Sequence, residues 1–335
     1  MKVDLATRWL GLKLRTPIVV GSSPLGEKLD TLKRLEEAGA AAVVLPSLYE
    51  IELEHDEAEI VHVLDQGTEA FDEATSYLPD IQDFHTGPKD YLDRLTKTKQ
   101  ALGVPVIGSL CGMSKAGWAD YARRMQEAGA DAIELNGYFV PTDPELDAKA
   151  VEDRYVESVA TACGAVSIPV AVKIAPYFTA PVHFARRLQK AGAKGLTLFQ
   201  RVLDPDIDLE ELHVGVDTHL SGSDELGNTL RWLAILHGRV GCDLAASTGA
   251  HKAADVLKLL LAGACSVQMA SALIKNGPEH VTSVLKGVEL WLEEHEDPQV
   301  AEVEGSLSQL HCEEPQEYEH AQHHKKLIRY THHGE

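Results

Sequence analysis

The sequence of 335 residues is poor in several features, and each shortage excludes a kind of protein. It has five cysteines but no C-x-x-C pair, which argues against a disulfide framework and a cysteine-ligated zinc site. No apolar run reaches the roughly 18 residues that a membrane-spanning helix needs, and residues 1–21 lack the layout of a signal peptide. We therefore expect a cytoplasmic protein with reduced thiols, at Cys111, Cys163, Cys242, Cys265 and Cys312.

Positive charge is scarce as well, because 31 lysines and arginines stand against 52 aspartates and glutamates. The formal charge of −21 would repel a phosphate backbone, so nucleic acid is not an expected partner. An anionic cofactor would have to be held by local dipoles and single cations rather than by the overall field. Most of the acidity is expected to be solvated surface.

What the sequence does contain is a short phrase, Ala-Gly-Ala, that recurs at four places. Each copy follows a helix-like stretch such as LDTLKRLEE and precedes an apolar run such as AAVVLP. A small-residue turn that closes a helix and leads into a buried strand explains this order. The copies lie at residues 38–40, 128–130, 191–193 and 262–264.

Four further apolar runs, at residues 16–23, 104–110, 168–176 and 242–248, bring the number of expected strands to eight. Most of the eight are continuously apolar, as in a parallel sheet that is covered on both faces. Eight strands, each followed by a helix, predict an α/β protein of the (β/α)8 TIM barrel type. A doubly wound open sheet is the alternative, but GSSPLG is a poor match to its glycine-rich fingerprint.

Two connections are too long for a helix alone, namely residues 48–86 after the second strand and 201–228 after the sixth. Long insertions after barrel strands lie at the C-terminal face, where they cover or shape an active site. We expect one barrel over residues 1–292 and a polar, helical extension of the same domain over residues 293–335.

Lys173 is the most informative single residue, because it interrupts the apolar strand VAVKIAP. A buried cation without a partner is costly, so it must face either a partner or a ligand. A structural salt bridge is one explanation. A cation beside an electron-rich cofactor and an imine-forming amine are the functional ones.

Small residues stand before the helices that follow the seventh and eighth strands, in ASTGAHKAADV and VQMASALIKNGP. Backbone N–H groups in such loops can hold a phosphate, and barrels often use this region for that purpose. Tight packing alone is the other explanation.

The histidines near the C-terminus do not predict a metal site. They lie in a polar tail without carboxylates or thiolates at a ligand spacing, so solvated side chains are expected. These residues are His320, His323, His324, His332 and His333.

Five stretches together resemble the cytosolic, class 1 dihydroorotate dehydrogenases. In chain order they read LGLKLRTPIVVGSSPL, GVPVIGSLCGMS, ADAIELN, IPVAVKIAPYF and AGACSVQMASALIKNGP. The resemblance extends from Leu10 to the region of Gly305 and implies an FMN-containing barrel that is usually dimeric. Segments of the NGYFVPTDPE and DPDIDLE types are shared with the bacterial group called dihydroorotate dehydrogenase-like proteins.

The resemblance implies a role for specific strand ends. Asn136 and Lys173 match positions at the isoalloxazine ring or the substrate, and Gln200 stands where the family carries an asparagine. A lysine at the N1–C2=O edge of a flavin would stabilise the charge of the reduced ring. The residues implied in cofactor binding are Ser22, Ser23, Ser47, Asn136, Lys173, Gln200, Thr248, Gly249, Ala250, Ala270 and Ser271.

The sequence departs from the family in the substrate half of the site. The family follows this asparagine with Ser-Cys-Pro-Asn, whose cysteine is the base, whereas residues 137–141 read GYFVP. The family's lysine after the second strand is replaced by Ser47, and its asparagine-rich substrate loop by residues 74–80, ATSYLPD. The remaining candidates for a catalytic base are Tyr138 and Cys111. Because a lost base costs two to four orders of magnitude in rate, we expect weak or no activity on dihydroorotate.

The expected function is that of an FMN-dependent oxidoreductase of pyrimidine-biosynthesis type, which passes hydride from a CH–CH substrate to the flavin. Two alternatives remain, a phosphate-binding barrel with Lys173 as an imine-forming amine and a non-catalytic, flavin-binding accessory subunit. The expected partners are a small-molecule substrate, a second copy in a homodimer and an electron-transfer protein. The last is expected because no cysteine cluster here could hold an iron–sulfur centre.

Overall fold

A computed structural model describes most of the chain. The described residues are 3–49, 88–112, 115–137, 139–201, 205–216, 219–296 and 299–319. Residues 50–86 of the insertion predicted after the second strand, Tyr138 and the five histidines of the tail lie outside them.

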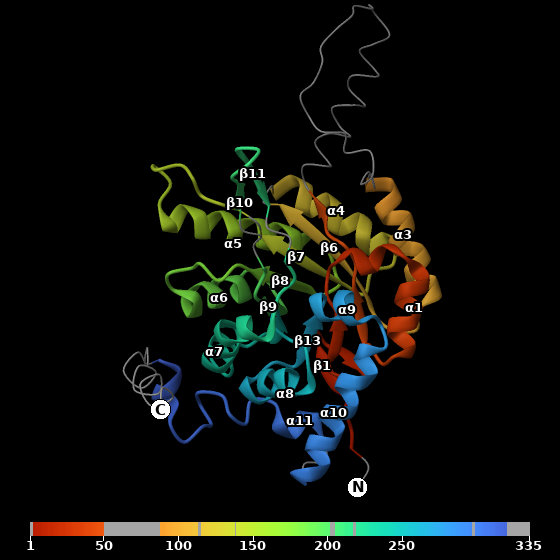
Figure 1. Ribbon diagram of the computed structural model, residues 1–335. Helices are drawn as coiled ribbons and strands as arrows, with labels where there is room; N and C mark the ends of the chain where they lie inside the picture. Colours follow the sequence, from red (N-terminus) through yellow and green to blue (C-terminus); the bar gives the residue numbers. More distant parts are fainter. Residues whose placement is uncertain are drawn as a thin grey trace, which may run out of the picture.

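Eight parallel strands form a closed barrel, which confirms the predicted fold (Figure 1). The ring closes because β4 pairs with both β3 and β6. The short β5 (Leu48–Tyr49) also pairs with β6, beyond the end of β4. Each predicted apolar run supplies one of the eight strands. They are β3 (Ile18–Val20), β4 (Ala42–Val44), β6 (Val106–Gly112), β7 (Ala132–Gly137), β8 (Val170–Ile174), β9 (Gly195–Leu198), β12 (Asp243–Ser247) and β13 (Ser266–Met269).

Helices surround the barrel in chain order. The main ones are α1 (Leu29–Glu37), α3 (Pro88–Ala101), α4 (Lys115–Glu127), α5 (Ala148–Ala165), α6 (Pro181–Lys190), α7 (Leu226–Leu236), α8 (Ala253–Ala262) and α10 (His280–Glu294). Shorter segments are η1 (Pro24–Glu27), η2 (Ser223–Glu225), α9 (Ser271–Asn276), α11 (Val300–Val303) and η3 (Pro315–Tyr318).

The Ala-Gly-Ala phrase ends a helix at all four places. Its glycines have φ between +98° and +118°, a region that residues with a Cβ rarely adopt. The following alanine amide donates to a carbonyl in the last turn of the helix, as when Ala40 N donates to Leu35 O at 3.0 Å. The chain then enters the next strand directly, so each copy of the phrase connects a helix of the barrel to the strand that follows it.

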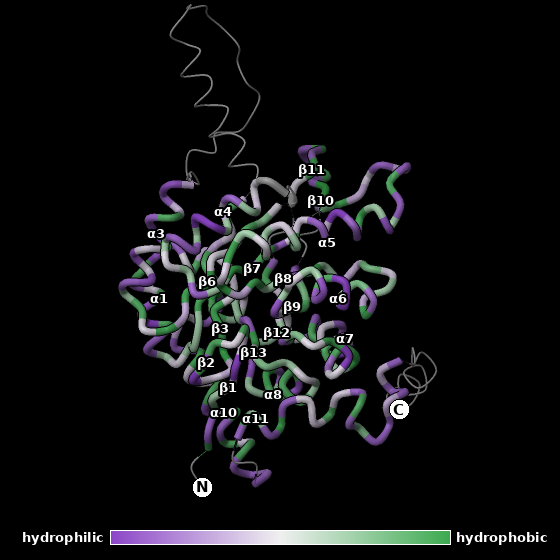
Figure 2. Tube along the Cα trace, turned by 180° about the vertical axis from the view of Figure 1, so that it is seen from behind, coloured by the Kyte–Doolittle hydropathy of each residue, from purple (hydrophilic) through white to green (hydrophobic). Residues whose placement is uncertain are grey.

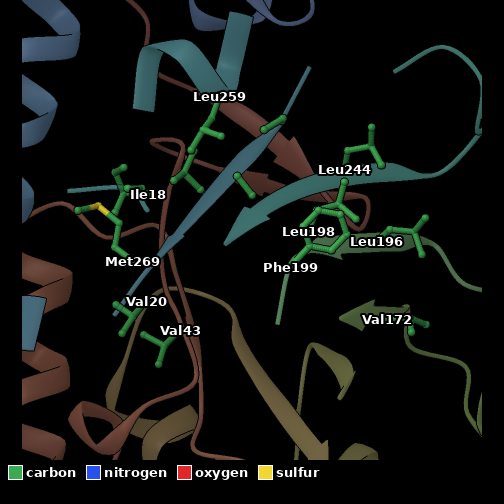
Figure 3. Packing of buried hydrophobic residues seen from close by; sticks show 14 of the residues in the cluster. Ile18, Val20, Val43, Val172, Leu196, Leu198, Phe199, Leu244, Leu259 and Met269 are labelled. Carbon is green, nitrogen blue, oxygen red and sulfur yellow. The ribbon is translucent and has the colours of Figure 1, made fainter. Parts of the chain in front are cut away.

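The core lies between the strands and the helices, where hydrophobic residues of both gather (Figures 2 and 3). Outward-facing strand residues such as Ile18, Val172 and Leu196 are fully or almost fully buried there. A second cluster lies inside the barrel, where Trp9 and Leu10 of an N-terminal hairpin meet small strand residues such as Ala171. This hairpin, β1 (Thr7–Trp9) and β2 (Leu12–Leu14), fills the N-terminal end of the barrel. The opposite, C-terminal end carries the cavity described below.

The insertion after the sixth strand contains a second hairpin, β10 (Pro205–Asp208) and β11 (His213–Val216). The C-terminal residues 299–319 pack against α7 and α8. Gly305 N donates to Leu260 O of α8 at 2.9 Å, and Gln309 N donates to Ala234 O of α7 at 3.0 Å. The boundary expected at residue 292 falls in the last turn of α10, and the division of the domain there remains a prediction. Within the described residues, no helix is long and apolar enough to cross a bilayer.

Candidate active site

A polar cavity lies at the C-terminal ends of the barrel strands. Its empty space, including the open mouth, is about 770 Å³. Seven of the eight barrel strands contribute to it directly or through the loop that follows them. The described residues that line it are Gly21, Ser22, Ser47, Tyr49, Asn136, Lys173, Gln200, Arg201, Ser221, Ser247, Thr248, Gly249, Ala250, Gln268, Ala270 and Ser271.

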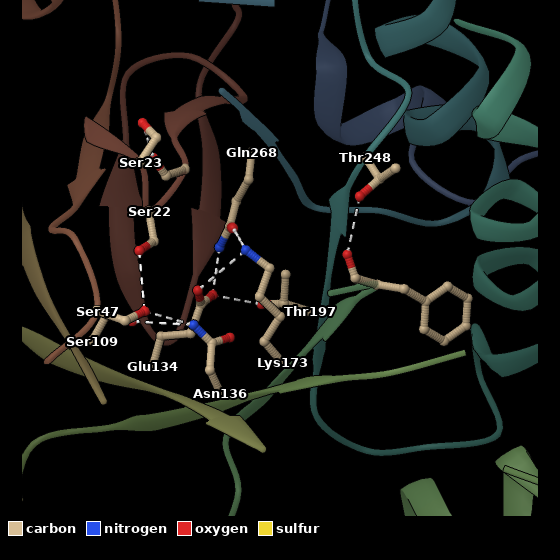
Figure 4. Close-up of polar contacts among 12 residues, drawn as sticks. Ser22, Ser23, Ser47, Ser109, Glu134, Asn136, Lys173, Thr197, Thr248 and Gln268 are labelled. Carbon is tan, nitrogen blue, oxygen red and sulfur yellow. Dashed lines mark hydrogen bonds and ion pairs between the residues drawn. The ribbon is translucent and has the colours of Figure 1, made fainter. Parts of the chain in front are cut away.

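Lys173 reaches this cavity from β8, and Glu134 of the neighbouring β7 lies beside it (Figure 4). Its Nζ lies 3.5 Å from Glu134 Oε1 and donates to Gln268 Oε1 at 2.9 Å. The Lys173 side chain keeps 9% of its surface exposed, whereas the Glu134 side chain has none. Lys173 therefore has the structural partner that one explanation requires, and it also borders the cavity; its functional role remains a prediction.

Glu134 is held by a buried network. Its Oε2 accepts from Gln268 Nε2 at 2.5 Å and from Thr197 Oγ1 at 2.9 Å. A fully buried carboxylate is costly unless it is paired and hydrogen-bonded, and Lys173 supplies the compensating charge. Three strands, β7, β9 and β13, thus fix the position of one ammonium group.

A chain of hydroxyl groups lies next to Asn136, the register partner of Lys173 on the neighbouring β7. Asn136 Nδ2 donates to Ser47 Oγ at 2.9 Å and lies 3.3 Å from Ser109 Oγ. Ser47 Oγ also lies 2.8 Å from Ser109 Oγ and 3.2 Å from Ser22 Oγ. The neighbouring Tyr91 hydroxyl accepts from Ser109 N at 2.8 Å, and burial raises its pKa well above the usual range. These groups are uncharged, so this part of the cavity offers hydrogen bonds rather than charge.

Two amide oxygens at the cavity have no hydrogen-bond partner among the described residues. They are Asn136 Oδ1 and Gln200 Oε1, and both atoms are buried. Buried polar atoms are normally satisfied, so each unsatisfied oxygen here is an acceptor available to a ligand.

The loop after β12 supplies backbone donors. The amides of Gly249 and Ala250 donate to no acceptor in the described part of the chain. The next two amides, of His251 and Lys252, are already bound by Asp255 Oδ2 at 3.0 and 3.1 Å. The start of α8 is therefore capped from within, and the free donors lie one turn earlier than the helix itself.

Arg201 forms the outer wall of the cavity next to Gln200. Its Nε donates to Glu225 Oε2 at 3.1 Å, and its NH1 group donates to His219 O at 2.7 Å. Its NH2 group lies 2.7 Å from His219 Nε2. These contacts tie the start of the sixth-strand insertion to its end.

The structure gathers ten of the eleven predicted cofactor residues around this one cavity. The exception is Ser23, whose Oγ donates to Gly21 O at 3.0 Å instead of lining the cavity. The roles of these residues remain predictions. Sequence reasoning did not single out Glu134, Thr197 or Gln268, although each is a polar residue within an otherwise apolar strand, the same signal that identified Lys173.

The two candidate bases are less well supported. Tyr138 lies outside the described residues. Cys111 is buried at the end of β6 and is not among the described residues that line the cavity. At Gly137 a Cβ atom would lie 2.0 Å from the ring of Tyr155, whose hydroxyl donates to Gly137 O at 2.9 Å. Tyr155 therefore leaves no room for a serine or cysteine at residue 137.

Comparison with known proteins places the barrel in a family. The family model described as dihydroorotate dehydrogenase matches residues 84–292. The chain belongs to the dihydroorotate dehydrogenase family. This result confirms the resemblance seen in the sequence and identifies the chain as a member of an oxidoreductase family with a TIM-barrel fold.

Individual dihydroorotate dehydrogenases match between half and nearly nine tenths of the chain. The catalytic subunit of dihydroorotate dehydrogenase B (NAD(+)) from Thermoplasma volcanium is 28% identical over 288 residues, covering 82% of this chain and 88% of the relative. The corresponding protein of Methanocaldococcus jannaschii is 26% identical, with 87% and 96% covered. Dihydroorotate dehydrogenase A (fumarate) of Limosilactobacillus reuteri DSM 20016 is 31% identical over 50% of this chain and 57% of its own length.

Proposed function

We propose that the cavity binds FMN and that the protein transfers hydride between this flavin and a CH–CH substrate. The observation that carries the proposal is the meeting, in one cavity, of the Lys173 ammonium, two unsatisfied amide oxygens and the free amides of Gly249 and Ala250. A phosphorylated flavin offers complementary groups to all three.

The residues present fit this cofactor. Lys173 would lie at the electron-rich edge of the ring, where negative charge gathers on reduction. Asn136 Oδ1 and Gln200 Oε1 could accept from an N–H of the ring or of the substrate. The amides of Gly249 and Ala250, with Ser271 after the neighbouring strand β13, would hold the phosphate. When bound, the flavin supplies the two-electron acceptor chemistry that the side chains lack.

We favour the flavin-binding role of Lys173 over the imine-forming alternative. Its Nζ lies 3.5 Å from the Glu134 carboxylate and donates to Gln268 Oε1 at 2.9 Å, so the amine is already engaged by two side chains of the protein. A non-catalytic subunit that keeps the flavin remains the second candidate, because Gly137 stands where the family's base loop begins.

The absorbance spectrum of freshly purified protein tests the proposal. We expect flavin bands between about 350 and 500 nm and release of FMN on denaturation. Reduction of these bands by an electron donor would distinguish an oxidoreductase from a non-catalytic subunit. Colourless protein that takes up no added FMN would refute the proposal.

Turnover of dihydroorotate is a separate measurement. Because residues 137–140 contain neither cysteine nor serine, we expect a rate two to four orders of magnitude below that of enzymes with a positioned base. We further propose that the active form is a homodimer and that it passes electrons to a partner protein. Both follow from the resemblance and can be tested by sedimentation and by co-purification.

A further inference from the structure

We propose that this site selects a substrate without a negative charge, because carboxylates of the protein already neutralise both cations of the described cavity lining. The inference rests on the proposed function, since it concerns the substrate of the same flavin site. Dihydroorotate carries a carboxylate, so the inference names a different chemical class for this chain.

The positive charge of the first cation, Lys173, is balanced by the buried carboxylate of Glu134. Glu134 Oε1 lies 3.5 Å from its Nζ, and the Glu134 side chain is fully buried. A carboxylate at this depth is screened little by water, so its effect on the cavity is strong. The pair therefore contributes hydrogen-bond donors to the cavity with nearly no net charge.

The positive charge of the second cation, Arg201, is balanced by the carboxylate of Glu225. Its guanidinium meets Glu225 at 3.1 Å and the His219 carbonyl at 2.7 Å. The side chains of Arg201 and Glu225 are 22% and 32% exposed, so water screens this pair more than the first. Each of its three guanidinium nitrogens already contacts Glu225 or His219, so the group is not a free fork for a carboxylate.

Three segments of the sequence that follow strands of the barrel contain no lysine or arginine. Residues 50–87 follow β5 and contain 12 acidic residues but no lysine or arginine. Residues 202–222, which follow Arg201, and residues 137–148, which follow β7, also contain neither. The lack of lysine and arginine is therefore shared by these three segments and does not come from one substitution.

The remaining polar groups favour an uncharged ligand. Asn136 Oδ1 and Gln200 Oε1 are buried acceptors without a partner in the described chain. An acceptor attracts N–H or O–H donors and repels a carboxylate, which has no proton to donate. The class of substrate that fits is an uncharged compound with N–H or O–H groups beside its CH–CH bond, such as a neutral cyclic amide.

A matched pair of ligands tests the inference on the FMN-bound protein. Orotate and its methyl ester share one ring and differ in the charge of one group, and binding of either would perturb the flavin spectrum. We expect the ester to bind at least tenfold more tightly than the acid. Orotate binding as tightly as the ester, or more tightly, would overturn the inference.

Sulfite provides a test that does not depend on recognition of any substrate ring. This anion adds reversibly to an oxidised flavin and leaves negative charge on it, so its Kd reports the charge of the site. We expect weak sulfite binding by the wild type and at least tenfold tighter binding by Glu134→Gln, which leaves Lys173 uncompensated. Glu225→Gln should tighten it by a smaller factor, because that pair is more exposed.

The control variant is Thr197→Val, which removes a hydrogen bond to Glu134 but no charge. Its sulfite affinity should stay within about twofold of the wild type. If sulfite affinity does not rise in either glutamine variant while FMN stays bound, the compensation argument is wrong. Protein that binds no FMN would instead refute the proposed function, before any of these titrations is made.

Discussion

Gly249 shows at the scale of one residue how the proposed phosphate site depends on backbone geometry. Its φ is +83°, and a Cβ atom would lie 2.7 Å from Leu226 N. Both the conformation and the close approach of α7 require glycine here. The free amides of this loop exist because the chain turns at this position.

We therefore expect Gly249→Ala to weaken FMN binding at least tenfold and to cost about 1–3 kcal/mol of unfolding free energy. Gly227→Ala is the matched control, because Gly227 lies in the nearby α7 with no atom within 4 Å of an added Cβ. This control should be neutral or slightly stabilising, since alanine favours a helix. Equal FMN affinity in both variants would contradict the role of the loop.

Lys173 and Glu134 also show what can be predicted from the sequence at this scale. A lysine in an apolar strand had to have a partner or a ligand, and this reasoning predicted its place at the cavity. Its partner could not be identified, because the choice among Glu134 and other acidic residues depends on which strands become neighbours and in which register. Gln268 lies 134 residues from Glu134 in the sequence and is nevertheless hydrogen-bonded to it.

Among the elements, the N-terminal hairpin β1–β2 closes the N-terminal end of the barrel. The amides of its turn, at Leu10 and Gly11, bind the Asp243 carboxylate, with Leu10 N 2.6 Å from Oδ2. Glu304, which follows α11, lies in the same partly buried region. Burial and the charge of Asp243 raise the pKa of Glu304 to about 7.

This raised pKa makes stability depend on pH. The folded state favours protonated Glu304, so the stabilisation is complete below the unfolded pKa of about 4.3 and is lost as the pH rises through about 7. We expect Glu304→Gln to raise the unfolding free energy by about 1–3 kcal/mol at pH 8 and to change it little at pH 5. Urea unfolding at the two pH values measures this difference. The control Glu302→Gln alters an exposed residue of α11 and should show no such dependence.

The same comparison between sequence and structure holds for whole elements. The eight strands were predictable because most of them are continuous apolar runs, and the Ala-Gly-Ala phrase marked four of their starts. The two hairpins were not predicted. The first is short, and its burial comes from strands far along the chain, as where Gly195 leaves room for Leu10. The second hairpin is exposed, with Leu209 and Leu212 more than 80% accessible, so its sequence lacks the apolar pattern of a buried strand.

For the whole molecule, the acidic composition and the polar cavity fit one account. A chain with a net charge of −21 attracts no anion through its overall field, so an anionic cofactor has to be held by local groups. The barrel brings these groups together at one end, with an ammonium on β8 and free amides after β12. The phosphate is the part of FMN that the amides would recognise.

Titration of flavin-stripped protein with FMN and with riboflavin is the most direct measurement of this central claim. The account predicts one FMN per chain and at least tenfold weaker binding of riboflavin, which lacks the phosphate and its charged hydrogen bonds to the loop. Equal affinity for the two flavins, or no binding of FMN, would contradict it.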